Sequence, residues 1–211
     1  MASGTSPLPS GYRELEYIMS NNGSYIDTGY VITSNNVSAE IEYFQTGDTD
    51  VQGQYFPLFG SLATDYRNGR YGFGVSQRYM HPSVGSGVNL MVGRMEYNVF
   101  DGMTLCVWHK LVLSSIGYNF IVNIDNGSKT YNGTQIGNIA NNVSTTVFVN
   151  RSWGNPQSVG LKVRRFKLVH DGVVALDMIP ALRVSDMELG LYDLANSQFH
   201  TNSGPGGFLY Q

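Results

Sequence analysis

The sequence contains a single cysteine, Cys106, so the chain cannot form an internal disulfide bond. Charged residues make up only 14% of the composition, and the formal net charge is −3. A chain with this balance has no basic field that would attract a nucleic acid backbone. No apolar stretch approaches the about 20 residues that a membrane-spanning helix requires. These absences argue against a disulfide-stapled domain, a nucleic-acid-binding protein and a membrane-inserted protein.

The first ten residues lack both the basic segment and the apolar core of a secretory signal. We therefore expect synthesis in a cytoplasm without export by a signal peptide. The leader is small, polar and proline-containing, which fits either a flexible tail or an arm that docks onto a partner. We expect this leader to span residues 1–10 and one folded domain to span residues 11–211.

Glycine (25 residues) and aromatic residues (12%) are plentiful, which is typical of short strands joined by tight turns. Apolar and polar residues alternate in several segments, most clearly from Val37 to Tyr43, and this is the period of a half-buried strand. No helical period is sustained anywhere. Alternation, or a short apolar run between turn residues, predicts strands over 12–18, 25–30, 37–43, 55–60, 71–76, 90–92, 96–100, 105–113, 118–124, 128–131, 145–149, 161–168 and 173–178.

Several local signals predict how these strands are joined. Asn126-Gly127 follows an alternating run and predicts a tight hairpin, and Asp171-Gly172 predicts a second turn. The apolar positions of 161–163 and 166–168 have opposite parity, so a bulge at Arg164-Arg165 would let both groups face the core.

Prolines and a small-residue segment predict where strands are interrupted. Pro57 indicates an edge strand or a strand start, and Pro180 is expected to end the strand before it. His81–Gly87 is interpreted as a loop. Leu105 and Val107 flank Cys106 and favour a buried small side chain over a reactive thiol.

Short motifs at both ends of the chain carry a family resemblance. Leu-Glu-Tyr-Ile at 15–18 and Tyr-Ile-Asp-Thr-Gly at 25–29 stand near the start, and Gly-Leu-Tyr-Asp stands at 190–193. Together with Trp-His-Lys-Leu at 108–111, they resemble laminin-G-like domains of the concanavalin A-like lectin/glucanase superfamily. The resembling version is met in bacteriophage virion proteins and bacterial surface proteins. The resemblance implies an all-β, two-sheet antiparallel jelly-roll sandwich, and it leaves the middle of the chain variable.

Carboxylate pairs are the first candidates for chemistry, because glycoside hydrolysis needs two acids that flank one bond. The Glu-x-Asp-x-Glu type of motif that related hydrolases carry is absent. The histidines are far apart and lack metal-ligand spacing, and we interpret each acid pair as solvated charge. We therefore expect a protein that is not an enzyme. The acid pairs are Glu14/Glu16, Glu40/Glu42 and Asp186/Glu188, and the histidines are His81, His109, His170 and His200.

Sugar recognition combines aromatic faces with planar hydrogen-bonding groups, and two loops offer both. Trp153 is the central candidate, although it could instead pack over the end of the sandwich; Trp108 is a poorer candidate because its strand neighbours look like core. Asp48 and Asp50 could supply the oxygen ligands that calcium prefers, or could form a plain turn. The candidate ligand-binding residues are Asn150, Arg151, Trp153 and Asn155 in one loop and Tyr66, Arg67 and Arg70 in the other.

The resemblance and the missing hydrolase motif favour a non-catalytic recognition or adhesion module displayed on a phage virion, as a capsid decoration, head or tail fibre. Its expected partners are a host-surface glycan and other virion proteins that contact the N-terminal leader, and a homo-oligomer fits the symmetry of such particles. The alternative is a purely structural decoration protein docked through that leader. A glycan-cleaving enzyme ranks third.

Overall fold

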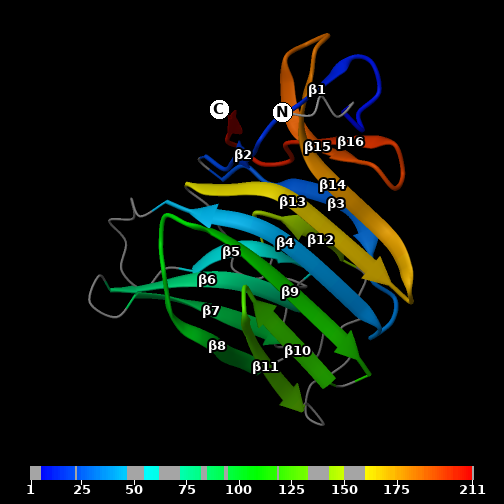
Figure 1. Cartoon of the computed structure of the whole chain (residues 1–211). Coiled ribbons are helices and arrows are strands. Elements are labelled where there is room, and N and C mark those ends of the chain that lie inside the picture. Colours follow the sequence, from blue (N-terminus) through cyan, green and yellow to red (C-terminus); the bar gives the residue numbers. More distant parts are fainter. Residues whose placement is uncertain are drawn as a thin grey trace.

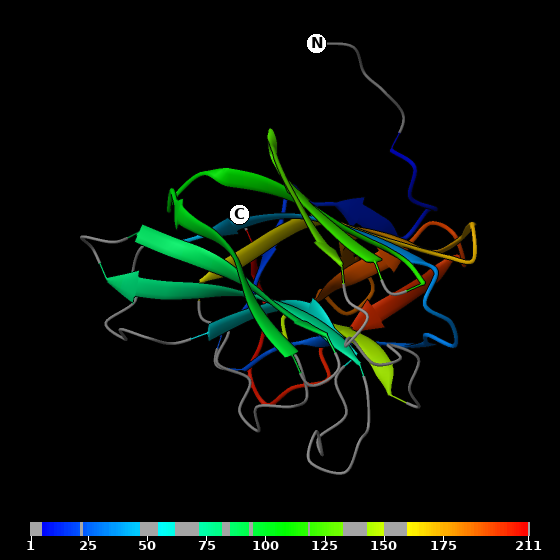
Figure 2. The same cartoon turned by 90° about the horizontal axis from the view of Figure 1, so that it is seen from below.

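The computed structural model describes residues 6–21, 23–46, 55–61, 72–81, 85–92, 95–117, 119–132, 143–149 and 160–210. These residues form two stacked antiparallel β-sheets, which confirms the predicted all-β, two-sheet class (Figures 1 and 2). No helix in the described ranges has the length and apolar character needed to cross a membrane.

The larger sheet lies in front in Figure 1 and has the order β11-β10-β9-β4-β13-β14-β15-β16, with β1 on β14 and β2 between β13 and β17. Its strands are β1 (Tyr12–Glu14), β2 (Ile18–Met19), β4 (Val37–Gln45), β9 (Trp108–Ile116), β10 (Asn119–Ile124), β11 (Gly127–Asn132), β13 (Leu161–His170), β14 (Val173–Arg183), β15 (Glu188–Asp193), β16 (Gln198–Thr201) and β17 (Leu209–Tyr210).

The smaller sheet has the order β3-β12-β5-β6-β7-β8. Its strands are β3 (Ile26–Val31), β5 (Tyr55–Gly60), β6 (Phe73–His81), β7 (Gly85–Val92), β8 (Met95–Met103) and β12 (Ser144–Val147).

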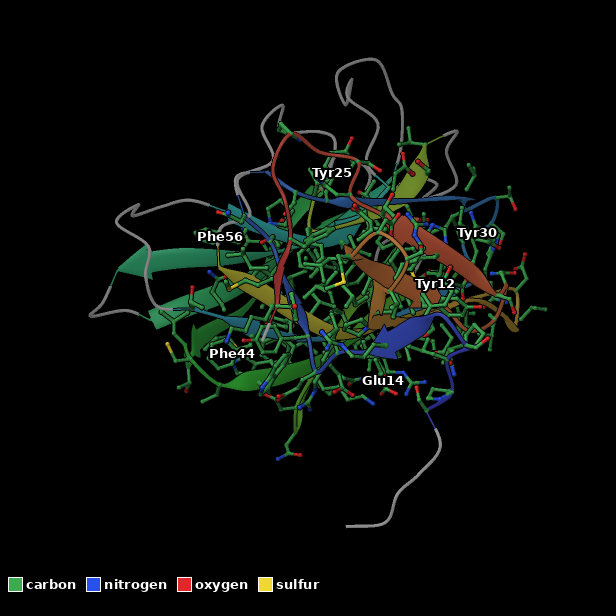
Figure 3. The ribbon with its side chains drawn as sticks, turned by 90° about the horizontal axis from the view of Figure 1, so that it is seen from above. Tyr12, Glu14, Tyr25, Tyr30, Phe44 and Phe56 are labelled. Carbon is green, nitrogen blue, oxygen red and sulfur yellow. The ribbon has the colours of Figure 1, made fainter. Side chains whose placement is uncertain are left out.

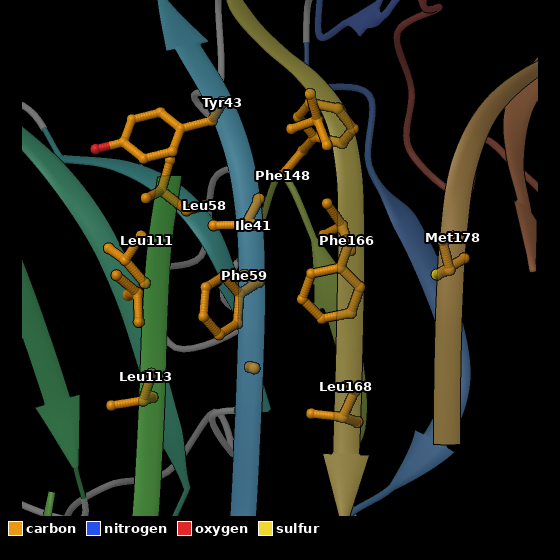
Figure 4. Close-up of a cluster of buried hydrophobic side chains, with 14 of the residues drawn as sticks. Ile41, Tyr43, Leu58, Phe59, Leu111, Leu113, Phe148, Phe166, Leu168 and Met178 are labelled. Carbon is orange, nitrogen blue, oxygen red and sulfur yellow. The ribbon is translucent and has the colours of Figure 1, made fainter. Parts of the chain in front are cut away.

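The core lies between the two sheets and is built by alternate residues of each strand (Figure 4). In β4 every second side chain from Val37 to Gln45 is buried, as the alternation predicts. Phe166 of β13 meets Phe59 of β5 at a ring-centroid distance of 5.4 Å, so the two layers interlock through aromatic rings. Tyr43 is also completely buried, and burial, followed by the charge of Asp125, raises the pKa of its hydroxyl.

The predicted bulge and the second turn are confirmed. The register between β13 and β4 shifts between Val163 and Arg165, which leaves Arg164 as the extra residue and turns both apolar groups of β13 inward. Asp171 and Gly172 take φ values of +51° and +79° at the turn into β14. The predicted hairpin is also present, but Ile124 pairs with Gly127, so its central residues are Asp125 and Asn126.

The two proline predictions were wrong about strand neighbours. Pro57 lies inside β5, which is an interior strand of the smaller sheet. The register between β5 and β6 shifts just after Pro57. On the other side, the described part of β12 pairs with Phe59 and Gly60 of β5 and not with Pro57. Pro180 does not end β14. On one side of β14, β13 pairs as far as Met178 and β1 pairs from Ala181 onward. Pro180 lies between these two residues, so its missing N–H falls where the neighbouring strand changes from β13 to β1.

Three further expectations are corrected. The segment predicted as one strand over 12–18 forms β1 and β2, because the chain crosses from β14 to β13. The predicted loop at His81–Gly87 is largely strand, since β6 reaches His81 and β7 begins at Gly85. Cys106 is exposed rather than buried, because it occupies a bend before β9 with φ of +58°.

Candidate functional site

The ligand-binding residues predicted from sequence lie outside the described residues, so we build the candidate site from the strands that the structure places. This applies to Asn150, Arg151, Trp153 and Asn155, to Tyr66, Arg67 and Arg70, and to the calcium candidates Asp48 and Asp50.

The candidate site starts from a row of side chains on the outer face of the larger sheet. Phe44 of β4 pairs with Trp108 of β9 on one side and with Lys162 of β13 on the other. Lys162 in turn pairs with Met19 of β2, which pairs with Leu209 of β17. Directly opposed residues point to the same face of a sheet, and their neighbours in each strand are buried, so this row faces away from the core. Figure 3 shows Phe44 on the side away from Phe56 of the smaller sheet.

Cations stack on the aromatic rings of this row. The Lys162 ammonium lies 4.3 Å from the ring centroid of Tyr17 and 4.9 Å from that of Phe44. The Arg164 guanidinium lies 4.6 Å from the ring centroid of Trp108, which is itself 5.6 Å from Phe44. Exposed contacts of this kind stabilise by about 0.5–1 kcal/mol each. We call these five residues the aromatic–cation face.

The acids on the same surface are already paired. Glu42 accepts a hydrogen bond from Arg164 Nε at 2.6 Å, and Glu40 lies 2.8 Å from Lys110 Nζ. Among the residues that the structure describes, no carboxylate lies within ion-pairing distance of Lys162. Lys162 is therefore the cation on this face that is available to an anionic ligand.

A hollow of about 460 Å³ opens beside Lys162. Its lining includes Tyr17 and Met19, together with Leu209 and Tyr210, which are 45% and 43% exposed. The Arg13 guanidinium lies 5.8 Å from the Tyr210 ring. One cation between apolar and aromatic walls suits a flat, partly apolar molecule that carries a negative charge.

The other two predicted acid pairs lie elsewhere on the surface. Asp186 is held by Arg183, whose hydrogen bonds lower the pKa of that carboxyl despite a smaller opposing effect of desolvation. Glu14 accepts a hydrogen bond from Ser6, and Glu16 is exposed. No group of three or more histidine, cysteine or acidic residues in the described segments is arranged to hold a metal ion.

Two of the buried histidines hold loops in place. Backbone N–H of Ser34 donates to Nε2 of His170, which assigns the ring proton to Nδ1, 2.8 Å from the Tyr30 hydroxyl oxygen that would accept it. His109 bridges the Asp125 carboxylate and the backbone carbonyl of Thr104, each at 2.7 Å. His170 and His109 therefore have a structural role, because each joins the end of its strand to a neighbouring loop or turn.

Sequence analysis missed the aromatic–cation face, because it ranked Trp108 as a poorer candidate on the ground that its strand neighbours look like core. His109, Leu111 and Leu113 are buried, so Trp108 has the opposite parity and lies on the outer face, partly exposed. The alternation itself could have given this signal. The partners of Trp108 could not be found this way, because Phe44 and Lys162 reach it through non-local strand pairing.

No protein-family model matches the chain, and no curated protein matches it in sequence. Among solved structures, a native heptameric SAP-like pentraxin from Limulus polyphemus is similar at a TM-score of 0.51 with 11% identity, over 74% of this chain and 76% of that one. Domains LG4-5 of the mouse laminin α1 chain give a TM-score of 0.51 with 9% identity, over 82% of this chain and 45% of that one. Galectin LEC-6 of Caenorhabditis elegans gives 0.45 with 10% identity, over 76% of this chain and 96% of that one. At these identities the likeness to the pentraxin and the laminin domains shows the fold alone, a jelly-roll sandwich of two antiparallel sheets.

Proposed function

We propose that this protein is a non-catalytic carbohydrate-binding module whose aromatic–cation face recognises a saccharide bearing a carboxylate. The observation that carries the proposal is Lys162, which stacks on two rings, has no carboxylate partner among the described residues and lines the hollow. A sugar ring presents apolar C–H patches beside polar groups. Leu209 and Tyr210, which line the hollow and are partly exposed, would meet the patches, and Lys162 would pair with the carboxylate.

Binding of uronic acids tests the proposal. Isothermal titration with galacturonic and glucuronic acid oligosaccharides, and with galactose and glucose oligosaccharides of the same length, compares charged with neutral ligands. Removing one charged hydrogen bond costs about 1.5–3 kcal/mol, so we expect Lys162→Met to weaken binding of the acidic probes about 10- to 100-fold. Added salt should weaken that binding as well.

Lys167→Met is the matched control, because Lys167 lies on the same face of β13 but outside the row. It should leave the affinity for acidic oligosaccharides unchanged. Equal binding of acidic and neutral probes by the wild type would contradict the proposal, and so would a Lys162→Met variant that binds as the wild type does.

We further propose that the module is displayed on a phage particle, where its ligand would be a host-surface glycan and other virion proteins would contact its leader. The support is the sequence resemblance at both ends of the chain. In the described part of the leader, Ser6 donates to Glu14 and the Pro9 carbonyl accepts from Tyr12, so residues 6–10 pack beside β1. Immunogold labelling of native particles tests the location. Particles that incorporate a variant lacking residues 1–10 as well as the full chain would exclude docking through the leader.

A further inference from the structure

A second cavity, of about 410 Å³, opens between β3 of the smaller sheet and β14, β15 and β16 of the larger sheet. One wall is Thr28–Tyr30 of β3, the edge of the smaller sheet. The other wall is the start of β14 with the inner faces of β15 and β16. Because Asp193, Gln198 and His200 share the inward parity of Leu191, their side chains face this cleft and not the aromatic–cation face. In Figure 3, Tyr30 and Phe44 lie at opposite sides of the molecule.

His200 lines this cleft and has a ring nitrogen without a hydrogen-bond partner in the described part of the chain. The residue is only 6% exposed, and its Nε2 has no partner among the described residues. Since Nε2 is the ring nitrogen without such a partner and the backbone of Asp27 favours a proton on the ring, we assign the proton of the neutral ring to Nδ1 and the lone pair to Nε2. Burial lowers the pKa of His200, against the opposing charges of Asp193 and Asp27, and keeps the ring neutral. A buried acceptor left without a donor costs about 1–3 kcal/mol, which a ligand hydroxyl would recover.

Tyr30 supplies the complementary donor. Its hydroxyl oxygen already accepts the Nδ1 proton of His170, since Nε2 of that ring accepts from Ser34. The phenolic proton of Tyr30 is therefore left to donate to another group. An acceptor on one side of the cleft and a donor on the other match a hydroxyl group, which can both donate and accept.

The remaining lining fits an uncharged molecule. Asp193 is completely buried and lines the cleft with a carboxyl group, and no lysine or arginine is among the described residues that line it. Asn196 uses its Nδ2 on Ala175 and Asp193, which leaves its Oδ1 as an acceptor. At the mouth, Val173 and Val174 are 68% and 41% exposed and offer an apolar contact. An anion would be repelled here.

We propose that this cleft is a second binding site, for an uncharged sugar ring whose hydroxyl donates to Nε2 of His200 and accepts from Tyr30. Its volume is within the range of about 300–1,000 Å³ typical of small-molecule pockets. The site differs from the aromatic–cation face in position and in ligand charge, so each can fail without the other.

Titration of the isotope-labelled full chain with the methyl glycosides of glucose, galactose and N-acetylglucosamine, at millimolar concentration, tests this site by NMR. We expect at least one glycoside to shift the amide signals of Gly29, Asn196 and Gln198. Val174→Lys places a long side chain at the mouth without altering the interior and should weaken that binding at least about tenfold. Val184→Lys, at an exposed valine in the turn before β15, is the matched control and should bind as the wild type does.

His200→Phe removes the acceptor while keeping a ring of similar shape, and it should also weaken binding by about tenfold or more. Lys162→Met should leave the glycoside titration unchanged, which separates this site from the aromatic–cation face. The proposal is overturned if no glycoside shifts these signals, as expected if a water alone satisfies His200. It is equally overturned if Val174→Lys binds the glycoside as tightly as Val184→Lys.

Discussion

The bulge in β13 predicts that two single-residue deletions, three positions apart, have very different costs. Val163 pairs with Tyr43 and Arg165 pairs with Glu42, so Arg164 is the one residue of this segment without a partner in β4. Deleting Arg164 removes the bulge and leaves every inward side chain of β13 facing the core. The deletion loses a surface ion pair, worth about 0–1 kcal/mol, and one cation–π contact of about 0.5–1 kcal/mol.

Deleting Lys167 instead breaks the parity. Either Leu168 and His170 must turn outward, or Phe166 must turn outward while Arg165 turns toward the core. Leu168 and Phe166 are both completely buried. Losing a buried leucine costs about 2–5 kcal/mol and losing a buried phenylalanine about 3–5 kcal/mol. The first route also breaks the hydrogen bonds of His170, at about 1 kcal/mol each. We therefore expect the Lys167 deletion to cost at least about 3 kcal/mol more than the Arg164 deletion.

Urea unfolding followed by tryptophan fluorescence measures this difference, with equal m-values as the condition for comparing the free energies of unfolding. Substitution controls separate the loss of a side chain from the shift in register. Arg164→Ala should cost about 0.5–2 kcal/mol, because it loses the same ion pair and cation–π contact as the deletion. Lys167→Ala should cost less than about 1 kcal/mol, because the side chain faces outward. Equal destabilisation by the two deletions would refute the assignment of Arg164 as the extra residue.

Two further predictions follow from buried and exposed groups. Burial lowers the pKa of His200 from its ordinary value of 6.5, so the unfolded chain takes up this proton at a higher pH than the folded one. The contribution of neutral His200 to the free energy of unfolding is complete above pH 6.5 and is lost as the pH falls below it. Urea unfolding at pH 7 and at pH 5 should therefore show a smaller loss of stability for His200→Phe than for the wild type. Equal losses would contradict a lowered pKa for His200. Because Cys106 is exposed, native protein should react fully with a maleimide at close to the rate of the unfolded chain; reaction only after unfolding would contradict its placement.

The alternation of apolar and polar residues predicted those features that depend on a single strand and not on its neighbours. The alternation in β4 and the parity change in β13 appear directly in the sequence, because side chains of a strand alternate between its faces wherever the strand lies. The proline predictions failed for the opposite reason. Whether Pro180 is tolerated depends on which strand lies beside it, and β13 and β1 come from distant parts of the sequence.

The candidate sites divide in the same way. The outward parity of Trp108 and Lys162 is a local property, but their shared row with Phe44 exists only because β9, β4 and β13 are neighbours. The pairing of a donor on Tyr30 with an acceptor on His200 is less accessible still. It depends on the tautomer of His170, which the backbone of Ser34 fixes from another loop. No periodicity encodes that chain of contacts.

The two proposed sites differ in how far ligand binding is coupled to stability. On the aromatic–cation face, Lys162 and Trp108 point away from the core, so substitutions there change the ligand while the inward residues keep the sheets together. In the cleft, His200 belongs to the inner layer and is part of both the fold and the site. A variant at His200 therefore alters stability and affinity together, whereas Val174, at the exposed mouth, reports on affinity alone. For this reason the valine variant gives the more decisive test of the cleft.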